Sequence, residues 1–251
     1  MSANGWYVYG VVDGGRTVDP DGGVGLVHSG PVAAIVTRVE LAEFDDLDER
    51  LNDPAWLEEK ARHHETVVSR ASREGPVVPL RFGAIYRRRE DVEKLLTERR
   101  DEFVADLERV RGRVELGVKG YVARGALEEL LARQRTTTPA ASPGRAYLER
   151  RQVQQDIAAE AKAMVAEAAR RTHTRLLERS VAGAVSRPHS RELSGRTEDM
   201  FLNAAYLVPA GDDSLRGEIA ALQLAYAPLS VSFEVTGPWP PYSFVGGEER
   251  R

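Results

Sequence analysis

Residues 229–245 read Leu229-Ser-Val-Ser-Phe-Glu-Val-Thr-Gly-Pro-Trp-Pro-Pro-Tyr-Ser-Phe-Val245, an alternating strand followed directly by a proline-rich aromatic tail. Prolines fix φ and lack a backbone donor, so the tail is not expected to continue as a central strand or to form a helix. Its aromatic side chains carry large apolar surfaces that need a place to pack; they are Trp239, Tyr242 and Phe244. We expect the tail to pack on its own C-terminal domain, and contact with a partner protein is the alternative.

The residues before this strand predict a C-terminal domain with a ferredoxin-like order of elements. The pattern runs strand, helix, strand, strand, helix, strand, which is the split βαβ arrangement. These elements fall at residues 113–122, 144–179, 180–186, 202–208, 212–225 and 229–235, with a short helix at 126–135 and a loop-like segment at 136–144. At a rise of about 1.5 Å per residue, the long helix exceeds roughly 45 Å, so we expect it to overhang its domain or to break once.

The N-terminal part of the chain predicts a smaller α+β domain. Strands are expected at residues 6–12, 25–28, 32–39 and 77–82, and a helix at 88–110. Another helix is expected to begin after Asp53, a good N-cap, with Pro54 in its first position, and to end before Gly75-Pro76. The fold class is therefore α+β with two domains: a small antiparallel sheet with helices over residues 1–112, and a modified ferredoxin-like domain with a long helix over 113–251, including the tail 237–251.

Composition limits the classes of function. The chain has 251 residues, with 35 basic and 39 acidic side chains and a formal net charge of −4. This balance argues against a general nucleic-acid binder, which needs a basic face. The absence of cysteine excludes thiolate chemistry and cysteine-based metal sites. No apolar run reaches the roughly 20 residues of a membrane span, and no signal peptide is recognisable, so we expect a soluble, cytoplasmic protein that binds no lipid membrane.

The sequence gives little support for catalysis or for a cofactor. Gly23-Val-Gly25-Leu-Val-His28 lacks the third glycine of a dinucleotide fingerprint and suits a hairpin loop better. The triplet His63-His64-Glu65 looks like a metal site, but neighbouring helix residues point about 100° apart. His64 lies on the apolar stripe of its helix and is expected to be partly buried, with His63 on the surface. We predict no catalytic residue, cofactor, metal or small-molecule substrate.

The strongest local positive charge lies at residues 87–89, three arginines that follow Arg81-Phe-Gly-Ala-Ile-Tyr86. This segment could bind an acidic protein surface or a phosphate. Alternatively, it begins a helix in which Glu90 and Asp91 favour the positive end of the dipole while the arginines are solvated. In that case Phe82 and Tyr86 are core residues.

Six blocks along the chain resemble one known family. They are Trp6-Tyr-Val-Tyr-Gly-Val-Val12, Val78-Pro-Leu-Arg-Phe-Gly-Ala-Ile-Tyr86, Glu115-Leu-Gly-Val-Lys119, Gly144-Arg-Ala-Tyr-Leu-Glu-Arg-Arg151, Leu202-Asn-Ala-Ala-Tyr-Leu-Val208 and Gly237-Pro-Trp-Pro-Pro-Tyr-Ser-Phe-Val245. Together, in this order, they resemble the GvpL/GvpF family of gas vesicle proteins. The resemblance implies two α+β domains and no catalytic activity. Nine positions correspond to signature residues of the family, and their role can be in folding. They are Arg81, Phe82, Gly83, Tyr147, Asn203, Tyr206, Pro238, Trp239 and Tyr242.

The same resemblance implies a function in gas vesicle formation. A family member is expected to bind the small hydrophobic shell protein GvpA and other accessory proteins during nucleation and assembly, and to limit aggregation of the shell protein. The alternatives are a minor component of the finished shell and, from another class, a nucleotide-binding protein or enzyme that uses the glycine loop or the arginines. The candidate partner-binding residues are Arg81, Phe82, Tyr86, Arg87, Arg88, Tyr206, Trp239, Tyr242 and Phe244.

Overall fold

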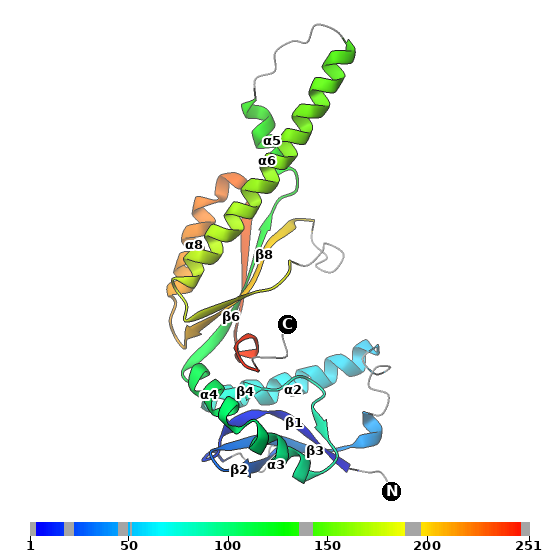
Figure 1. Cartoon of the computed structure of the whole chain (residues 1–251), viewed down its shortest axis with the longest axis vertical. Helices are drawn as coiled ribbons and strands as arrows, with labels where there is room; N and C mark the ends of the chain where they lie inside the picture. Colours follow the sequence, from blue (N-terminus) through cyan, green and yellow to red (C-terminus); the bar gives the residue numbers. More distant parts are fainter. Residues whose placement is uncertain are drawn as a thin grey trace. The chain divides into compact units, whose positions relative to one another are not determined.

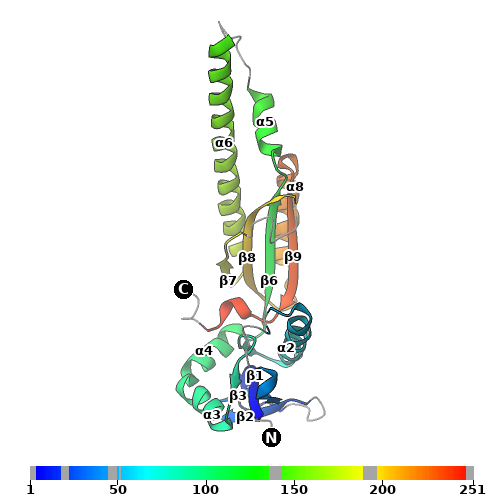
Figure 2. The ribbon, with the colours of Figure 1, turned by 90° about the vertical axis from the view of Figure 1, so that its right-hand side faces the viewer.

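The computed structural model describes residues 4–17, 23–44, 50, 52–135, 143–188 and 197–246 (Figures 1 and 2). The chain forms two compact units. The N-terminal unit comprises Met1–Glu115 together with Pro238–Arg251, and the C-terminal unit comprises Leu116–Gly237. Helices and antiparallel strands occur in both, which confirms the predicted α+β class.

A five-stranded sheet organises the N-terminal unit. Its strands are β1 (Asn4–Asp13), β2 (Gly25–Ser29), β3 (Val32–Glu40), β4 (Val77–Pro79) and the two-residue β5 (Ile85–Tyr86). The order is β2-β3-β1-β4, and β5 also pairs with β1. β5 was not predicted, because two residues carry no alternation that a pattern search can detect.

Both faces of this sheet are covered by helices (Figure 2). Tyr7 and Tyr9 of β1 belong to the core on the side of α2 (Pro54–Glu74), whereas Val8 belongs to the core on the side of α3 and α4. α2 begins as predicted, with the Asp53 carboxylate accepting hydrogen bonds from the Ala55 and Trp56 amides at 3.1 and 3.3 Å. The strand β1 is therefore central and covered on both faces.

The helix predicted for residues 88–110 is two helices, α3 (Arg89–Glu98) and α4 (Arg100–Val110). Arg99 joins them with φ −106° and ψ 22°, and its guanidinium lies 5.0 Å from the centroid of the Phe103 ring. α3 packs against β2 and β3, whereas α4 packs against β4 and β1. Because the sheet twists, one straight helix could not place the apolar faces of both α3 and α4 on it. Tertiary packing therefore divides a segment whose sequence pattern predicts one continuous helix.

A four-stranded sheet in the order β7-β8-β6-β9 forms the C-terminal unit with its helices. The elements are β6 (Arg113–Val122), α5 (Ala126–Gln134), α6 (Pro143–Leu177), β7 (Ala182–Val185), β8 (Asp199–Pro209), α8 (Ser214–Ala225) and β9 (Val231–Trp239). This element order is the predicted split βαβ arrangement. α6 packs against β8, α5 and α8 (Figure 1).

The long helix α6 does not break. Its 35 residues span about 52 Å at the usual rise per residue. The first side chains described on it are exposed, including Tyr147 at 60% and Leu148 at 66%, whereas Ile157 and Ala161 further along are buried. The expected overhang is thus the N-terminal part of α6.

The last strand runs further into the tail than predicted. β9 continues through Pro238 to Trp239, and a single 3-10 turn, η4 (Tyr242–Phe244), follows. Proline is tolerated in β9 because this strand lies at the end of the sheet order, where one side needs no backbone donor.

Candidate partner-binding surface

Two buried carboxylates fix the tail to the N-terminal unit. Glu115 is 9% exposed and accepts hydrogen bonds from the Ser243 amide at 2.7 Å and from the Ser243 hydroxyl at 2.8 Å. Asp106 is 3% exposed and accepts one from the Gly246 amide at 2.9 Å. Val245 is buried in the core that Val8 also joins. The expectation that the tail packs on the C-terminal domain is therefore wrong, because its polar and apolar partners belong to the N-terminal unit.

Arg109 ties the same carboxylate to the tail backbone. Its Nη1 donates to the Asp106 carboxylate at 2.7 Å and to the Phe244 carbonyl at 3.1 Å. A buried carboxylate without donors would cost several kcal/mol in desolvation, so the donors that the tail supplies to Asp106 and Glu115 stabilise the unit. We call residues 240–246, with these contacts, the tail clasp.

A polar and aromatic cluster lies between β1 and α2, next to the tail clasp. The Tyr7 hydroxyl accepts a hydrogen bond from the Gly83 amide at 3.1 Å and lies 2.9 Å from His64 Nδ1. The Tyr242 hydroxyl donates to Glu65 at 3.0 Å. Since the Tyr7 hydroxyl already accepts one hydrogen bond, it can donate its proton to Nδ1, which requires a neutral imidazole on His64.

The electrostatics of this cluster favour neutral side chains. Burial lowers the pKa of His64, and this effect outweighs the opposite influences of Glu65 and the Leu80 carbonyl. Burial raises the pKa of Tyr7 to about 12 and, together with Glu65, raises that of Tyr242 further. None of these groups has a pKa tuned towards neutral pH for proton transfer. Within the described ranges, no group of three or more His, Asp or Glu side chains could hold a metal ion.

His63 is exposed, as expected, but it also contacts β1. Its Nε2 lies 3.0 Å from the Tyr9 hydroxyl in a part-buried pair, and the two rings meet edge to face. Both histidines of the metal-like triplet therefore partner tyrosines of β1. This use of His63 could not be read from the sequence, because its tyrosine partner lies 54 residues earlier.

The structure separates the candidate contact residues into buried and exposed groups. Phe82 packs edge to face against Tyr7, Trp56 and His64. Tyr206 is 0% exposed, in the C-terminal unit, where its hydroxyl bonds His173 Nδ1 at 2.9 Å. The half-buried side chains of this set are Tyr86, Tyr242 and Phe244. The ring surfaces of these five residues are largely or wholly used within the chain.

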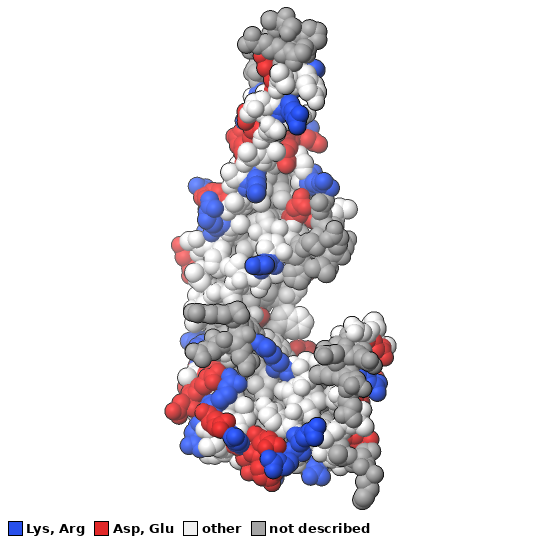
Figure 3. Space-filling view, turned by 45° about the vertical axis from the view of Figure 1, so that its right-hand side comes forward, with Lys and Arg blue, Asp and Glu red and all other residues white. Residues whose placement is uncertain are grey.

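The remaining candidates are accessible, and for them the contact role stays a prediction. They are Arg81, Arg87, Arg88 and Trp239. α3 begins at Arg89 with Glu90 and Asp91 in its first turn, as the helix-start interpretation predicts, and Arg88 in addition binds Asp91 through two hydrogen bonds of 3.2 and 2.9 Å. Trp239 is 43% exposed at the end of β9. On the face shown in Figure 3, basic and acidic side chains are interspersed, which does not resemble a nucleic-acid interface.

A further accessible apolar surface lies at the end of the C-terminal sheet and was not among the predicted contacts. It consists of Leu177 at 42%, Val181 at 48% and Val185 at 59% exposure, and we call it the β7 edge patch. The alternation of residues 181–185 signals a strand, but only the sheet order places that strand at an edge. None of the described helices has the length and hydropathy needed to cross a membrane.

Comparisons with known proteins agree along the whole chain. The family model described as "Gas vesicle synthesis protein GvpL/GvpF" matches residues 5–246. "Gas vesicle protein L" of Streptomyces sp. (strain CB03234) is 38% identical over 254 residues, covering 96% of this chain and 92% of that protein.

Two solved structures share the fold. GvpF from Anabaena sp. PCC7120 has a TM-score of 0.67 at 17% identity, covering 97% of this chain and 96% of that one. GvpF from Microcystis aeruginosa has a TM-score of 0.67 at 19% identity, covering 96% and 98%. At these identities the structures show the fold alone, whereas the family model and the Streptomyces relative show descent. The chain belongs to the GvpL/GvpF family of gas vesicle proteins, a family not known for enzymatic activity.

Proposed function

We propose that this protein binds the hydrophobic shell protein GvpA while gas vesicles assemble, and that it limits aggregation of the shell protein before it joins the shell. The observation that carries this proposal is the β7 edge patch, an accessible apolar surface beside a strand edge with which no strand of the described residues pairs. A subunit built to exclude water exposes apolar surface until it assembles, and covering that surface would keep it from aggregating.

The backbone of β7 favours a partner in extended conformation. Its register with β8 pairs Ala182 with Leu207 and Ala184 with Ala205, and the Ser186 amide donates to the Asn203 carbonyl at 2.8 Å. By alternation, the backbone groups of residues 183 and 185 point away from β8. Within the described residues, no strand pairs with that side of β7. A partner strand could add there through main-chain hydrogen bonds.

The apolar side chains lie where such a strand would contact them. A Cβ built on Gly183 would lie 3.2 Å from both His173 and Leu177 of α6, so odd-numbered side chains of β7 point to the face that α6 covers. Val185, at 59% exposure, therefore lies on the same face as Leu177, beside the open edge. Val181 precedes β7, and its amide donates to the Leu207 carbonyl at 2.8 Å, so its exposed side chain lies at the start of this edge. Proteins usually protect exposed apolar side chains at a strand edge with charge.

Co-purification tests this function directly. The chain would be coexpressed with GvpA, and binding and vesicle number would be compared for the wild type and a Val181→Lys/Val185→Lys variant. Lysines on a strand edge block strand addition, so the variant is expected to lose GvpA and vesicles while its circular dichroism spectrum is unchanged. Leu224→Lys is the matched control, because Leu224 is 79% exposed in the same unit but belongs to α8.

The outcomes separate the alternatives. If the wild type does not retain GvpA, the binding function is wrong. If the wild type binds and the β7 variant binds equally well, a different surface makes the contact. If detergent-washed vesicles retain the chain, it is a minor component of the finished shell, which is the alternative that the family resemblance also suggests.

A further inference from the structure

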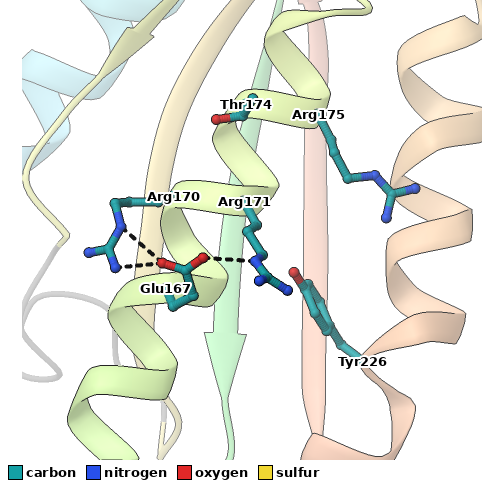
Figure 4. A pocket seen from close by; sticks show the side chains of 6 residues that line it. All are labelled: Glu167, Arg170, Arg171, Thr174, Arg175 and Tyr226. Carbon is teal, nitrogen blue, oxygen red and sulfur yellow. Dashed lines mark hydrogen bonds and ion pairs between the residues drawn. The ribbon is translucent and has the colours of Figure 1, made fainter.

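A second surface of the C-terminal unit has the opposite chemistry. A cleft of about 450 Å³ opens beside α6 and is lined by Glu167, Arg170, Arg171, Thr174, Arg175 and Tyr226 (Figure 4). Five of these residues lie on two successive turns of α6, and Tyr226 follows the end of α8. We call this cleft the arginine cleft.

Glu167 holds two arginines of the cleft in fixed orientations. Its carboxylate accepts from Arg170 Nη2 at 2.5 Å and from Arg171 Nε at 2.7 Å. The Arg171 bond uses only Nε, and within the described residues no partner is found for its two Nη groups. Figure 4 shows this end of the Arg171 guanidinium directed towards Tyr226. A guanidinium fixed in this way presents two parallel N–H donors, the fork that a carboxylate accepts.

Tyr226 adds a positioned hydroxyl on the other side of the cleft. Its ring is half-buried and packs with its centroid 6.4 Å from that of Phe233. Among the described residues, no hydrogen-bond partner is found for its hydroxyl. An acceptor placed between Arg171 and Tyr226 would therefore receive hydrogen bonds from both, without a rearrangement of either ring or helix.

The cleft and its neighbours carry an excess of positive charge although the whole chain is acidic. Arg175 and Arg179 both pair with Glu218, whose side chain is 12% exposed. Arg170 and Arg171 share Glu167, and Arg175 and Arg179 share Glu218, so these six side chains together carry two more positive than negative charges. That excess would attract an anionic partner and repel a cationic one.

The spacing of the arginines favours an acidic peptide over a small anion. Arg171 and Arg175 lie four residues apart on one helix, which separates neighbouring side chains by about 5–6 Å. Alternate residues of an extended peptide are about 6.6 Å apart, so two acidic side chains of one segment can reach both arginines. A single phosphate would reach only one of the two arginines. Arg175, whose Nε and Nη2 already pair with Glu218, contributes its charge and not a free fork.

We propose that the arginine cleft binds an acidic segment of a partner protein, with one carboxylate held between Arg171 and Tyr226 and a second one near Arg175. The cleft is distinct from the β7 edge patch in position and in chemistry, so this binding does not depend on the proposed contact with GvpA. It assigns the protein a second partner surface, selective for acidic rather than apolar segments.

Fluorescence anisotropy with the full chain tests this assignment. The probe is a labelled, end-capped peptide with glutamates at alternate positions, compared with the same peptide carrying glutamines. Arg171→Gln is expected to weaken binding of the glutamate peptide about tenfold, because it removes a charge-assisted bidentate contact. Arg171→Lys should recover only part of the affinity, since an ammonium cannot form the fork. Arg151→Gln, an exposed change on α6 outside the cleft, is the control.

Several results would overturn the assignment. Equal losses for Arg171→Gln and Arg151→Gln would show general attraction to a charged helix instead of a site. Equal binding of the glutamate and glutamine peptides would exclude carboxylate recognition. Binding of inorganic phosphate without binding of the glutamate peptide would show the wrong class of ligand. Circular dichroism of each variant confirms that the helix is intact.

Discussion

Val245→Ala should destabilise the N-terminal unit and leave the C-terminal unit unchanged. Val245 is 7% exposed and lies in the core that contains Val8 and Val110. The change removes two methyl groups from that core, worth about 1.6 kcal/mol in transfer free energy, and the cavity left behind adds to the loss. We expect the free energy of unfolding of this unit to fall by about 2 kcal/mol.

Tryptophan fluorescence makes this measurement specific. The chain has three tryptophans, Trp6, Trp56 and Trp239, and all belong to the N-terminal unit. Urea unfolding followed by their emission therefore reports that unit. With a slope of about 2 kcal/mol per molar urea, the midpoint should move down by about 1 M. Val185→Ala is the control, because Val185 is 59% exposed in the C-terminal unit and its loss should move this midpoint little.

An unchanged tryptophan midpoint for Val245→Ala would refute the tail clasp. It would mean that the tail contributes nothing to the core in which it lies. A change in slope instead of midpoint would point to an altered denatured state, and the midpoint shift would then need a second probe.

Three further predictions concern the same unit, each read by tryptophan-monitored urea unfolding. Ser243→Ala removes the hydroxyl donor to buried Glu115 and should cost about 1.5–3 kcal/mol, whereas an effect within a few tenths would show that this carboxylate does not depend on the serine hydroxyl. Trp239→Ala changes a side chain that is 43% exposed, so it should lower the free energy of unfolding less than Val245→Ala does. A larger decrease would show that Trp239 is the main anchor of the tail. Because this variant lacks the emission of Trp239, its unfolding is followed through Trp6 and Trp56. The pKa of His64 is lowered in the folded state, so below about pH 6.5 the unfolded chain binds more protons than the folded chain, and the free energy of unfolding should decrease as the pH falls. His64→Gln should weaken this pH dependence. An equal pH dependence in the variant would show that other groups cause it.

Local patterns in the sequence were sufficient for most elements but not for the placement of the tail. Asp53 and Pro54 mark the start of α2 because capping is a local interaction. The break at Arg99 has no local signal, since neither glycine nor proline occurs there, and it follows from the sheet that α3 and α4 must both cover. The tail was assigned to the wrong domain because its anchors, Asp106 and Glu115, look like surface charges until their burial is known.

The candidate site shows the same division between local and distant information. Aromatic residues of a family signature look alike in sequence whether they pack internally or contact a partner. Phe82 and Tyr206 prove to be packed within their units, and only a structure could show it. The arginine cleft was hidden for a related reason, because Tyr226, which completes the cleft, lies 55 residues after Arg171.

The tail clasp bears on where partner binding can be sought in this family member. The signature block at the end of the chain packs in the core of the N-terminal unit and binds two buried carboxylates. Its presence is therefore explained by the stability of this unit and gives no evidence for a contact with a partner. The β7 edge patch and the arginine cleft both lie in the C-terminal unit, outside the clasp. Variants of these two surfaces should therefore change binding while the tryptophan-monitored midpoint stays constant, and variants of the clasp should do the reverse. If clasp variants abolished partner binding at temperatures and urea concentrations where the N-terminal unit remains folded, the tail would have to be a contact as well as a support, and this separation would fail.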